Sequence, residues 1–368
     1  MMILYPDYDH SILNVAATLL KHYKAPTKYK SIPVLEDALT HDYNHVILML
    51  LDGMGINIVK EHLKESDFLR RNVKDVITSV FPPTTVAATN AVLSGLPPLA
   101  SGYLGWVQYF KKENSNCVVF LNVDYYDKTR KFDEVLRDKY LTYPTIYTQI
   151  EKNSPEVKTY ELFPSFRANG FETFQRQVSY AIELTQKPEK NFTYVYWTDP
   201  DLTEHTNGIH GKETIRVLNE LNTQVEYLAG QMHEDTLLIV IADHGLTDVK
   251  GIDLYKDTEL IGMLKRMPSM EPRASNFFVK RGMKRAFKKM FNEKYSQHFM
   301  LLTKKELLKI KLLGNGEPHH LLHDFLGDYL AISTSEYMFK MNSDKSFLAH
   351  HAGLTQEEME VPLIIYHQ

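Results

Sequence analysis

Carboxylate and imidazole side chains stand directly after apolar runs at several points of this sequence. They are Asp52, Asp201, His205, Asp243 and His244, joined near the end of the chain by the pair His350 and His351. Mixed carboxylate and imidazole ligands, with a position left for water, are typical of catalytic Zn²⁺ sites. The three carboxylates and three imidazoles needed for two divalent metal ions are therefore present in the sequence.

A hydroxyl group that could act as a nucleophile lies in the segment Phe81-Pro-Pro-Thr-Thr-Val-Ala-Ala-Thr-Asn-Ala-Val-Leu-Ser-Gly95. The prolines end any preceding element, and the small apolar residues over 86–93 predict a helix that stops at Gly95. Thr84 or Thr85 then stands at the helix start, where N–H groups and the helix dipole favour an oxyanion. The simpler interpretation is an ordinary helix-capping Thr. Beside two metal ions, such a hydroxyl would lose its proton readily and could attack phosphorus in line.

The elements that must position these groups alternate along the chain. Short apolar runs over 45–51, 192–197 and 236–242 predict strands that are buried on both faces, as in a parallel sheet. Helical patterns over 56–69 and 213–232 lie between them. The sequence therefore predicts an α/β fold, a three-layer sandwich with a central, mostly parallel sheet. In such sheets ligands bind beyond the carboxyl ends of the strands, where Asp52, Asp201 and Asp243 stand.

A change in composition after Gly251 indicates an insertion. Residues 280–311 hold eleven Lys or Arg against two acids. The insertion includes apparent strands at 277–279 and 328–333 and a helix at 284–297. We therefore expect a small inserted α+β domain over 254–345, a cap on a core made of 1–253 and 346–368. Its basic surface is either a solvated face or a lid that attracts anionic substrate.

Composition excludes several classes of function. The net charge of −4 over 368 residues gives no overall attraction for nucleic acid or for an anionic membrane. Cys117 is the single cysteine, so an internal disulfide and a Cys-based metal site are both excluded. The first 20 residues contain Asp7 and Asp9 but no Lys or Arg, unlike a signal peptide. We therefore expect a cytoplasmic protein with a small-molecule substrate, no nucleic-acid polymer and no membrane partner.

The order of these motifs resembles that of the alkaline phosphatase superfamily, and most closely its nucleotide pyrophosphatase/phosphodiesterase branch. The motifs are Leu51-Asp-Gly, Phe81-Pro-Pro-Thr-Thr followed by Ser94-Gly95, Pro200-Asp-x-x-x-His205, Ala242-Asp-His-Gly245 and a late His. The family spacing of ten residues before the Gly favours Thr85 over Thr84 as the nucleophile. The resemblance likewise favours Asp201 over Asp199 and His351 over His350.

The resemblance implies a ligand set for two metal ions, which we expect to be zinc, with manganese as the alternative. One ion would take Asp52, Thr85, Asp243 and His244, and the other would take Asp201, His205 and His351. The implied activity is hydrolysis of phosphodiester or pyrophosphate bonds through a phospho-threonine intermediate. A phosphomonoesterase, a phosphonate-ester hydrolase and a non-catalytic metal- or anion-binding protein are the alternatives.

The chain departs from the family pattern where the substrate would bind. Val86 stands where many members have an aromatic residue that helps hold a nucleobase, and Trp106 stands where they have an Asn that contacts a phosphate oxygen. Trp106 and Tyr103 are candidates for a wall of the substrate pocket, although buried aromatic residues more often belong to a core. The identity of the substrate is therefore open at this level.

Overall fold

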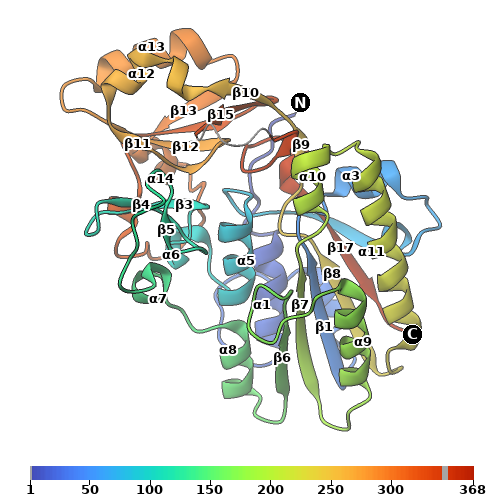
Figure 1. The fold of residues 1–368 in the computed structure, drawn as a ribbon. Helices are drawn as coiled ribbons and strands as arrows, with labels where there is room; N and C mark the ends of the chain where they lie inside the picture. Colours follow the sequence, from blue (N-terminus) through green and yellow to red (C-terminus); the bar gives the residue numbers. More distant parts are fainter. Residues whose placement is uncertain (1, 342–346) are drawn as a thin grey trace.

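The main sheet of the protein has the predicted mixed α/β architecture. The computed structural model describes residues 2–341 and 347–368 (Figure 1). Six strands lie in the order β2 (Val73–Thr78), β17 (Glu360–Tyr366), β8 (Thr236–Ile241), β1 (His45–Leu51), β7 (Asn191–Trp197) and β6 (Lys158–Leu162). The last four of these are mutually parallel, whereas β17 runs antiparallel to both of its neighbours. Strands β1 and β8 are buried along their whole length, as their uninterrupted apolar sequences predict.

Helices cover both faces of this sheet (Figure 1). On one face α1 (Ile12–His22), α5 (Thr85–Ser94) and α8 (Ile146–Asn153) pack on one another, and on the other α9 (Phe174–Thr185) and α3 (Ile56–His62) pack on α11 (Lys212–Gln231). The three-layer expectation is thereby confirmed.

The helix predicted over 56–69 is divided into α3 and a short α4 (Phe68–Arg71). Between them the Asp67 side chain accepts a hydrogen bond from the Lys64 amide at 2.7 Å. This local bond stabilises a turn that competes with the helix.

A second sheet forms a separate lobe. Its seven strands lie in the order β13 (Phe299–Thr303), β14 (Tyr329–Ser333), β12 (Ala274–Val279), β11 (Leu264–Glu271), β3 (Val107–Phe110), β4 (Ser115–Val118) and β5 (Val123–Asp124). Helices α12 (Thr258–Met263) and α13 (Lys284–Tyr295) also belong to this lobe (Figure 1). We call the sheet and these helices the cap.

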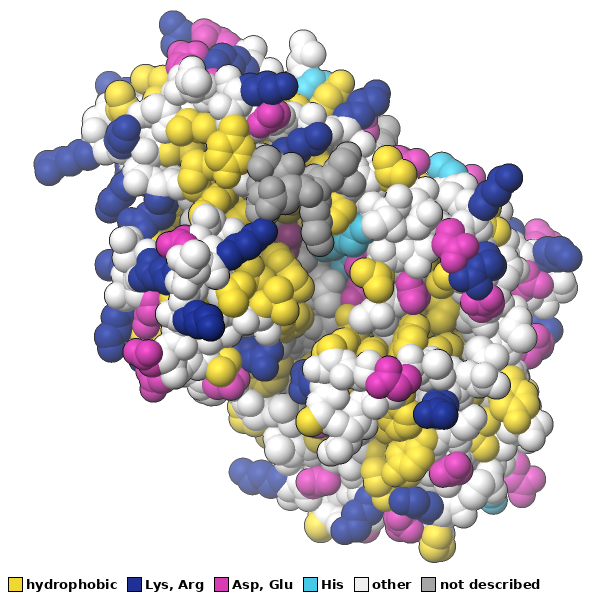
Figure 2. All heavy atoms as spheres, viewed as in Figure 1, with side chains coloured by type: hydrophobic (Ala, Val, Ile, Leu, Met, Phe, Trp, Pro, Cys, Tyr) yellow, Lys and Arg dark blue, Asp and Glu magenta, His cyan; other side chains and the backbone are white. Residues whose placement is uncertain are grey.

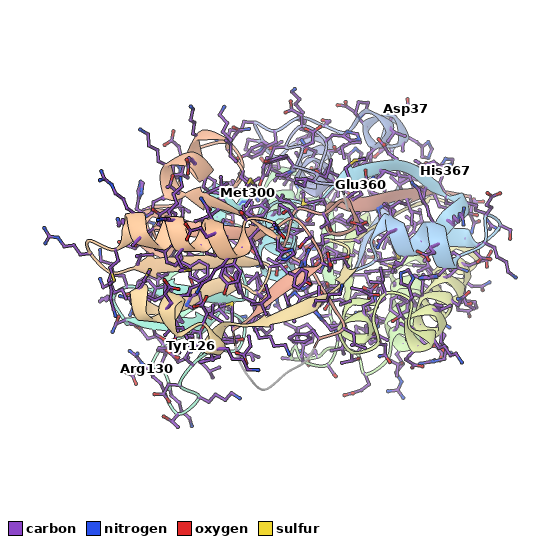
Figure 3. The ribbon with its side chains drawn as sticks, turned by 90° about the horizontal axis from the view of Figure 1, so that it is seen from above. Asp37, Tyr126, Arg130, Met300, Glu360 and His367 are labelled. Carbon is purple, nitrogen blue, oxygen red and sulfur yellow. The ribbon has the colours of Figure 1, made fainter. Side chains whose placement is uncertain are left out.

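The cap takes strands from two distant parts of the chain, so the predicted insertion over 254–345 is incomplete. Strands β3 to β5 join it through the pairing of Val107 with Met270 on β11. The hydroxyl of Tyr126, just after β5, also donates to the Pro268 carbonyl at 2.8 Å. Seen from above, Tyr126 lies in the lobe of the orange cap strands, and His367 lies at the opposite end of the molecule (Figure 3). The predicted end of the insertion at 345 falls outside the described residues.

A buried ion pair ties the cap to the last part of the core. The Arg273 guanidinium, in the turn between β11 and β12, contacts both carboxylate oxygens of Glu358 at 2.7 Å. Glu358, in α16 (Gln356–Met359), also accepts a hydrogen bond from the Gly353 amide at 2.7 Å. The segment that follows His351 is thereby fixed against the cap.

Candidate active site

Asp52 and Asp243 are brought together by the register of adjacent parallel strands. Leu50 at the end of β1 pairs with Ile241 at the end of β8, so the residues after both strands emerge at the same edge of the sheet. The Gly53 amide donates to Asp243 Oδ1 at 3.1 Å. Gly53 has a φ of +75°, which favours glycine, and this tight turn points its amide at the second strand end.

The Thr85 hydroxyl faces this pair of strand ends. Thr85 is the first residue of α5, and its Oγ1 lies 3.4 Å from Asp52 Oδ1 and 3.3 Å from His244 Nε2. The ring of His244 is fully buried, with Nε2 3.5 Å from oxygens of both Asp52 and Asp243. One hydroxyl, two carboxylates and one imidazole thus surround a common point.

A second group of ligand atoms lies beside the first. Asp201 and His205 occupy one face of the short helix α10 (Asp201–Asn207), where a spacing of four residues places them one turn apart. Asp201 Oδ1 lies 3.4 Å from His205 Nε2 and 3.7 Å from His351 Nε2. The His244 and His351 rings stack with centroids 4.0 Å apart, so the two groups of ligands are in direct contact.

The imidazoles are oriented by backbone carbonyl groups. His205 Nδ1 lies 2.9 Å from the Ala349 carbonyl oxygen, and His351 Nδ1 lies 3.2 Å from that of Pro83. A hydrogen bond at Nδ1 leaves Nε2 of each ring free to act as a ligand. Burial, reinforced by the His244 ring, holds the pKa of His351 well below its usual range, which favours the neutral, ligating form.

These residues fit divalent cations. Within residues 2–341 and 347–368, ligand atoms group as Asp201, His205 and His351, and as Asp52, Asp201 and His244, with the atoms of each group within 4.8 Å of one another. Asp201 Oδ1 and Asp243 Oδ2 are buried without a hydrogen-bond partner in that part of the chain. Burial, reinforced by the neighbouring carboxylates, raises the pKa of Asp52, and burial also raises that of Asp243. A bound cation would complement these buried oxygens.

The structure thus brings all seven predicted ligand residues to one place, and the alternatives make other contacts. The Thr84 hydroxyl points away to Glu271 at 2.7 Å, and Asp199 accepts a hydrogen bond from Thr203. His350 uses its Nδ1 to accept the His351 amide hydrogen bond at 2.9 Å.

The predicted substrate-contacting residues differ in accessibility. Val86 is fully buried and Tyr103 is 6% exposed, and both pack in a hydrophobic cluster at the base of the cap. Trp106 is 36% exposed. Of these three residues, Trp106 alone presents a sizeable surface.

Two buried residues of the site were missed by sequence reasoning. The Tyr196 hydroxyl donates a hydrogen bond to Asp52 Oδ2, and burial raises the pKa of Tyr196 so that it keeps its proton. Its place at the end of β7, beside Leu50 in register, was the available signal. Glu204 in α10 is fully buried, and neither of its oxygens has a partner among the described residues. No pattern in the sequence distinguishes it from an exposed helix residue.

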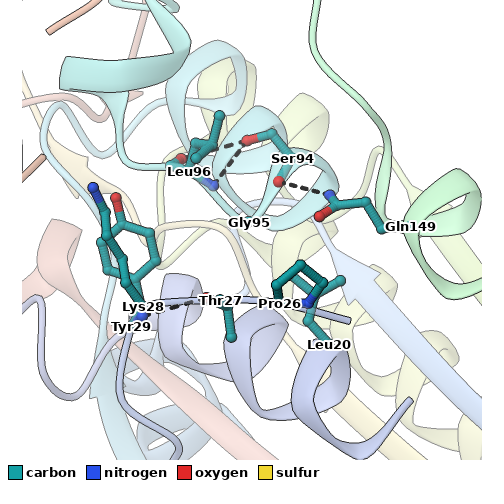
Figure 4. A pocket seen from close by; sticks show the side chains of 9 residues that line it. All are labelled: Leu20, Pro26, Thr27, Lys28, Tyr29, Ser94, Gly95, Leu96 and Gln149. Carbon is teal, nitrogen blue, oxygen red and sulfur yellow. Dashed lines mark hydrogen bonds between the residues drawn. The ribbon is translucent and has the colours of Figure 1, made fainter. Parts of the chain in front are cut away.

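The surface of the molecule agrees with this placement. Histidine side chains reach the surface in the hollow between the two lobes (Figure 2). An open groove elsewhere is lined by Leu20, Tyr29, Ser94, Gly95 and Gln149, among others, and lies at the far end of α5 (Figure 4). Its polar groups bond to one another, as when Gln149 donates to the Ser94 carbonyl at 3.1 Å.

The sequence and the fold are similar to those of known phosphodiesterases. A family model described as type I phosphodiesterase / nucleotide pyrophosphatase matches residues 46–353. The structure is similar to that of murine ectonucleotide pyrophosphatase/phosphodiesterase 5, with 17% identity, a TM-score of 0.65, and 86% of this chain and 87% of that chain covered. An inactive Thr-to-Ala variant of the murine protein in complex with AMP matches with 16% identity, a TM-score of 0.64 and the same coverage.

A further similar structure is phosphonoacetate hydrolase from Sinorhizobium meliloti in complex with phosphonoformate. It matches with 16% identity and a TM-score of 0.63 over 87% of this chain and 89% of that chain. In the described part of this chain, no helix has the length and apolar character needed to cross a bilayer.

Proposed function

Because the chain belongs to the type I phosphodiesterase / nucleotide pyrophosphatase family of hydrolases, we propose that this site cleaves phosphodiester or pyrophosphate bonds with Thr85 as nucleophile. The observation that carries the proposal is the position of the Thr85 hydroxyl. It stands at the N-terminus of α5, between Asp52 and His244, with the Asp201 group alongside. A nucleophile beside charge-neutralising groups and helix amides is what phosphoryl transfer needs.

The proposed reaction has two steps. Thr85 Oγ1 loses its proton and forms a bond to phosphorus as the ester oxygen on the opposite side leaves, which gives a phospho-threonine. The leaving oxygen takes up a proton from water. Water then breaks the bond between Oγ1 and phosphorus, releases the phosphate product and restores the hydroxyl. Asp52 and His244 hold Oγ1 in place. The first amides of α5, which begins at Thr85, would donate to the oxygens of the phosphoryl group.

Two divalent cations complete the proposed site. Asp52, Thr85, Asp243 and His244 would hold one, and Asp201, His205 and His351 would hold the other. When bound, they would lower the pKa of the Thr85 hydroxyl and of water and neutralise charge on the phosphate. The mixture of carboxylates and imidazoles favours zinc, with manganese as the alternative.

The first prediction concerns Thr85. Replacing Thr85 by Ala should reduce kcat for bis(p-nitrophenyl) phosphate by at least about a thousandfold, because the group that attacks phosphorus is lost. Circular dichroism and elemental analysis should show a retained fold and nearly normal metal content, since six of the seven proposed ligands remain. The matched control, Thr85→Ser, keeps a hydroxyl and should keep measurable turnover. Full activity of Thr85→Ala would refute the assignment.

A panel of substrates separates this proposal from its alternatives. The diester should be hydrolysed faster than p-nitrophenyl phosphate and than a phosphonate ester. The exposed Trp106, in place of the family's phosphate-contacting Asn, favours the phosphonate ester as the second candidate. A preference for the monoester would indicate a phosphatase. No product from any substrate with Zn²⁺ or Mn²⁺ present would favour a non-catalytic binding protein.

A further inference from the structure

Glu271 is a buried carboxyl group of the cap that lies against the start of the helix bearing the nucleophile. It is the last residue of β11 and is 2% exposed. One oxygen, Oε1, accepts hydrogen bonds from the Thr84 hydroxyl at 2.7 Å and from the Trp106 amide at 2.6 Å. This one atom therefore connects β11 to two segments that lie 187 and 165 residues away in sequence.

The bond to Glu271 removes Thr84 from the function expected of it. Thr84 is the N-cap residue of α5, with the extended φ of −145° and ψ of 145° that such residues adopt. A Thr in that position normally accepts a hydrogen bond from an amide of the first helical turn. Here the Thr84 side chain makes no capping bond, and its hydroxyl instead donates to Glu271.

The local structure around Glu271 is built for this contact. Met270, directly before it, has a φ of +73°, a conformation that is strained for a residue other than glycine. A Cβ on Gly105 would lie 3.1 Å from the Met270 Cα and 3.3 Å from Glu271 Oε1, so the two segments pack closely.

The contact is also costly for stability. Burial raises the pKa of Glu271 to about 7, despite the two hydrogen bonds that it accepts. A buried carboxyl group and a strained Met both reduce stability, so a function other than stability accounts better for them.

Resting on the proposed function, we infer that Glu271 is a positioning residue that keeps Thr84 from capping α5. The first-turn amides of α5 then stay available for the phosphoryl oxygens, which gain charge as Thr85 attacks. The same oxygen also accepts a hydrogen bond from the Trp106 amide. Through Glu271 the cap thus controls the anion-binding end of the catalytic helix.

The inference predicts a specific response to Glu271→Ala. Rotation of the Thr84 side chain alone would let it cap α5, since its backbone already has the required conformation. The holoenzyme should then lose roughly a hundredfold to a thousandfold in kcat for bis(p-nitrophenyl) phosphate, as when one oxyanion donor is removed. KM should change much less, and metal content should be normal. Glu271→Met, which fills the same space, replaces Ala if that variant fails to fold.

Three companion variants test the route of the effect. Glu271→Gln keeps the Oε1 acceptor and should recover most of the kcat lost in Glu271→Ala. Thr84→Val has no hydroxyl to form the cap, so adding Glu271→Ala in that background should change kcat by no more than about twofold. Glu113→Ala is the matched control: it removes another carboxyl–hydroxyl bond of the cap, to Tyr140 at 2.6 Å, and should leave kcat unchanged.

The outcomes distinguish this inference from the proposed function. An equal kcat loss in Glu271→Gln and Glu271→Ala, or an undiminished loss in the Thr84→Val background, would overturn the positioning role. So would an equal kcat loss in Glu113→Ala, which would indicate general loosening of the cap. An active Thr85→Ala variant would instead overturn the proposed function, whatever the Glu271 variants show.

Discussion

At the scale of single residues, this site contains buried carboxylate oxygens that have no hydrogen-bond partner among the described residues. Asp201 and Asp243 each present such an oxygen. Asp52, in contrast, accepts a hydrogen bond from the Tyr196 hydroxyl. Such groups reduce the stability of the metal-free protein, and bound cations would recover that loss. Function and stability are therefore opposed at these side chains.

Glu271 provides a prediction about pH at this scale. Its folded-state pKa of about 7 lies above the ordinary value of 4.5, so between these values the folded protein binds a proton that the unfolded chain has released. Stability should therefore fall as pH rises through this range and level off above it. Glu271→Gln does not titrate at this position. The unfolding free energy of the variant minus that of the unmodified protein should therefore increase by up to about 3 kcal/mol from pH 5 to pH 8.

Urea unfolding at several pH values tests this prediction. EDTA should be present, because metal binding has its own pH dependence. A difference between the two proteins that stays constant with pH would show that Glu271 is ionised equally in both states, contrary to the prediction.

At the scale of elements, the sequence predicted the strands and helices that carry the ligands. Strands such as β1 and β8 are continuous apolar runs closed by turn residues, and Gly95 ends α5 with a φ of +68° as expected. Strands β3 to β5 were missed because they have two to four residues each, too short for a periodic pattern. Glu271 and Tyr196 were missed for another reason: their roles depend on partners 187 and 144 residues away.

The turn after β1 provides a prediction at the scale of elements. Gly53 has a φ of +75°, and an added Cβ would lie 2.7 Å from the Asp201 Cβ and 2.8 Å from its Cα. Gly53→Ala should therefore move the start of α10, lower the unfolding free energy by at least about 1–2 kcal/mol and weaken metal binding.

Gly282→Ala is the matched control for this prediction. Gly282 has a similar φ of +84°, but nothing lies within 4 Å of an added Cβ. The control should lower the unfolding free energy through backbone strain but leave metal affinity unchanged. Equal metal affinity in both variants, by titration with a zinc indicator, would contradict the importance of the contact between Gly53 and Asp201.

At the scale of the whole molecule, the site lies where two lobes with separate sheets meet. The core supplies the ligands from five places, the ends of β1, β8 and β16 (Ala349–His350) and the starts of α5 and α10. The cap touches the catalytic helix through Glu271. The Arg273–Glu358 pair fixes the cap to the segment that follows His351. Because β3 to β5 come from the first half of the chain, the cap is formed by two separate segments and is not a single insertion.

The most direct test of the central claim is the location of metal ions by anomalous diffraction from crystals grown with zinc. We expect two peaks, one within ligand distance of Asp52, Thr85, Asp243 and His244, and one within ligand distance of Asp201, His205 and His351. Fewer than two peaks at these residues, or zinc bound only elsewhere, would contradict the two-metal account of this protein.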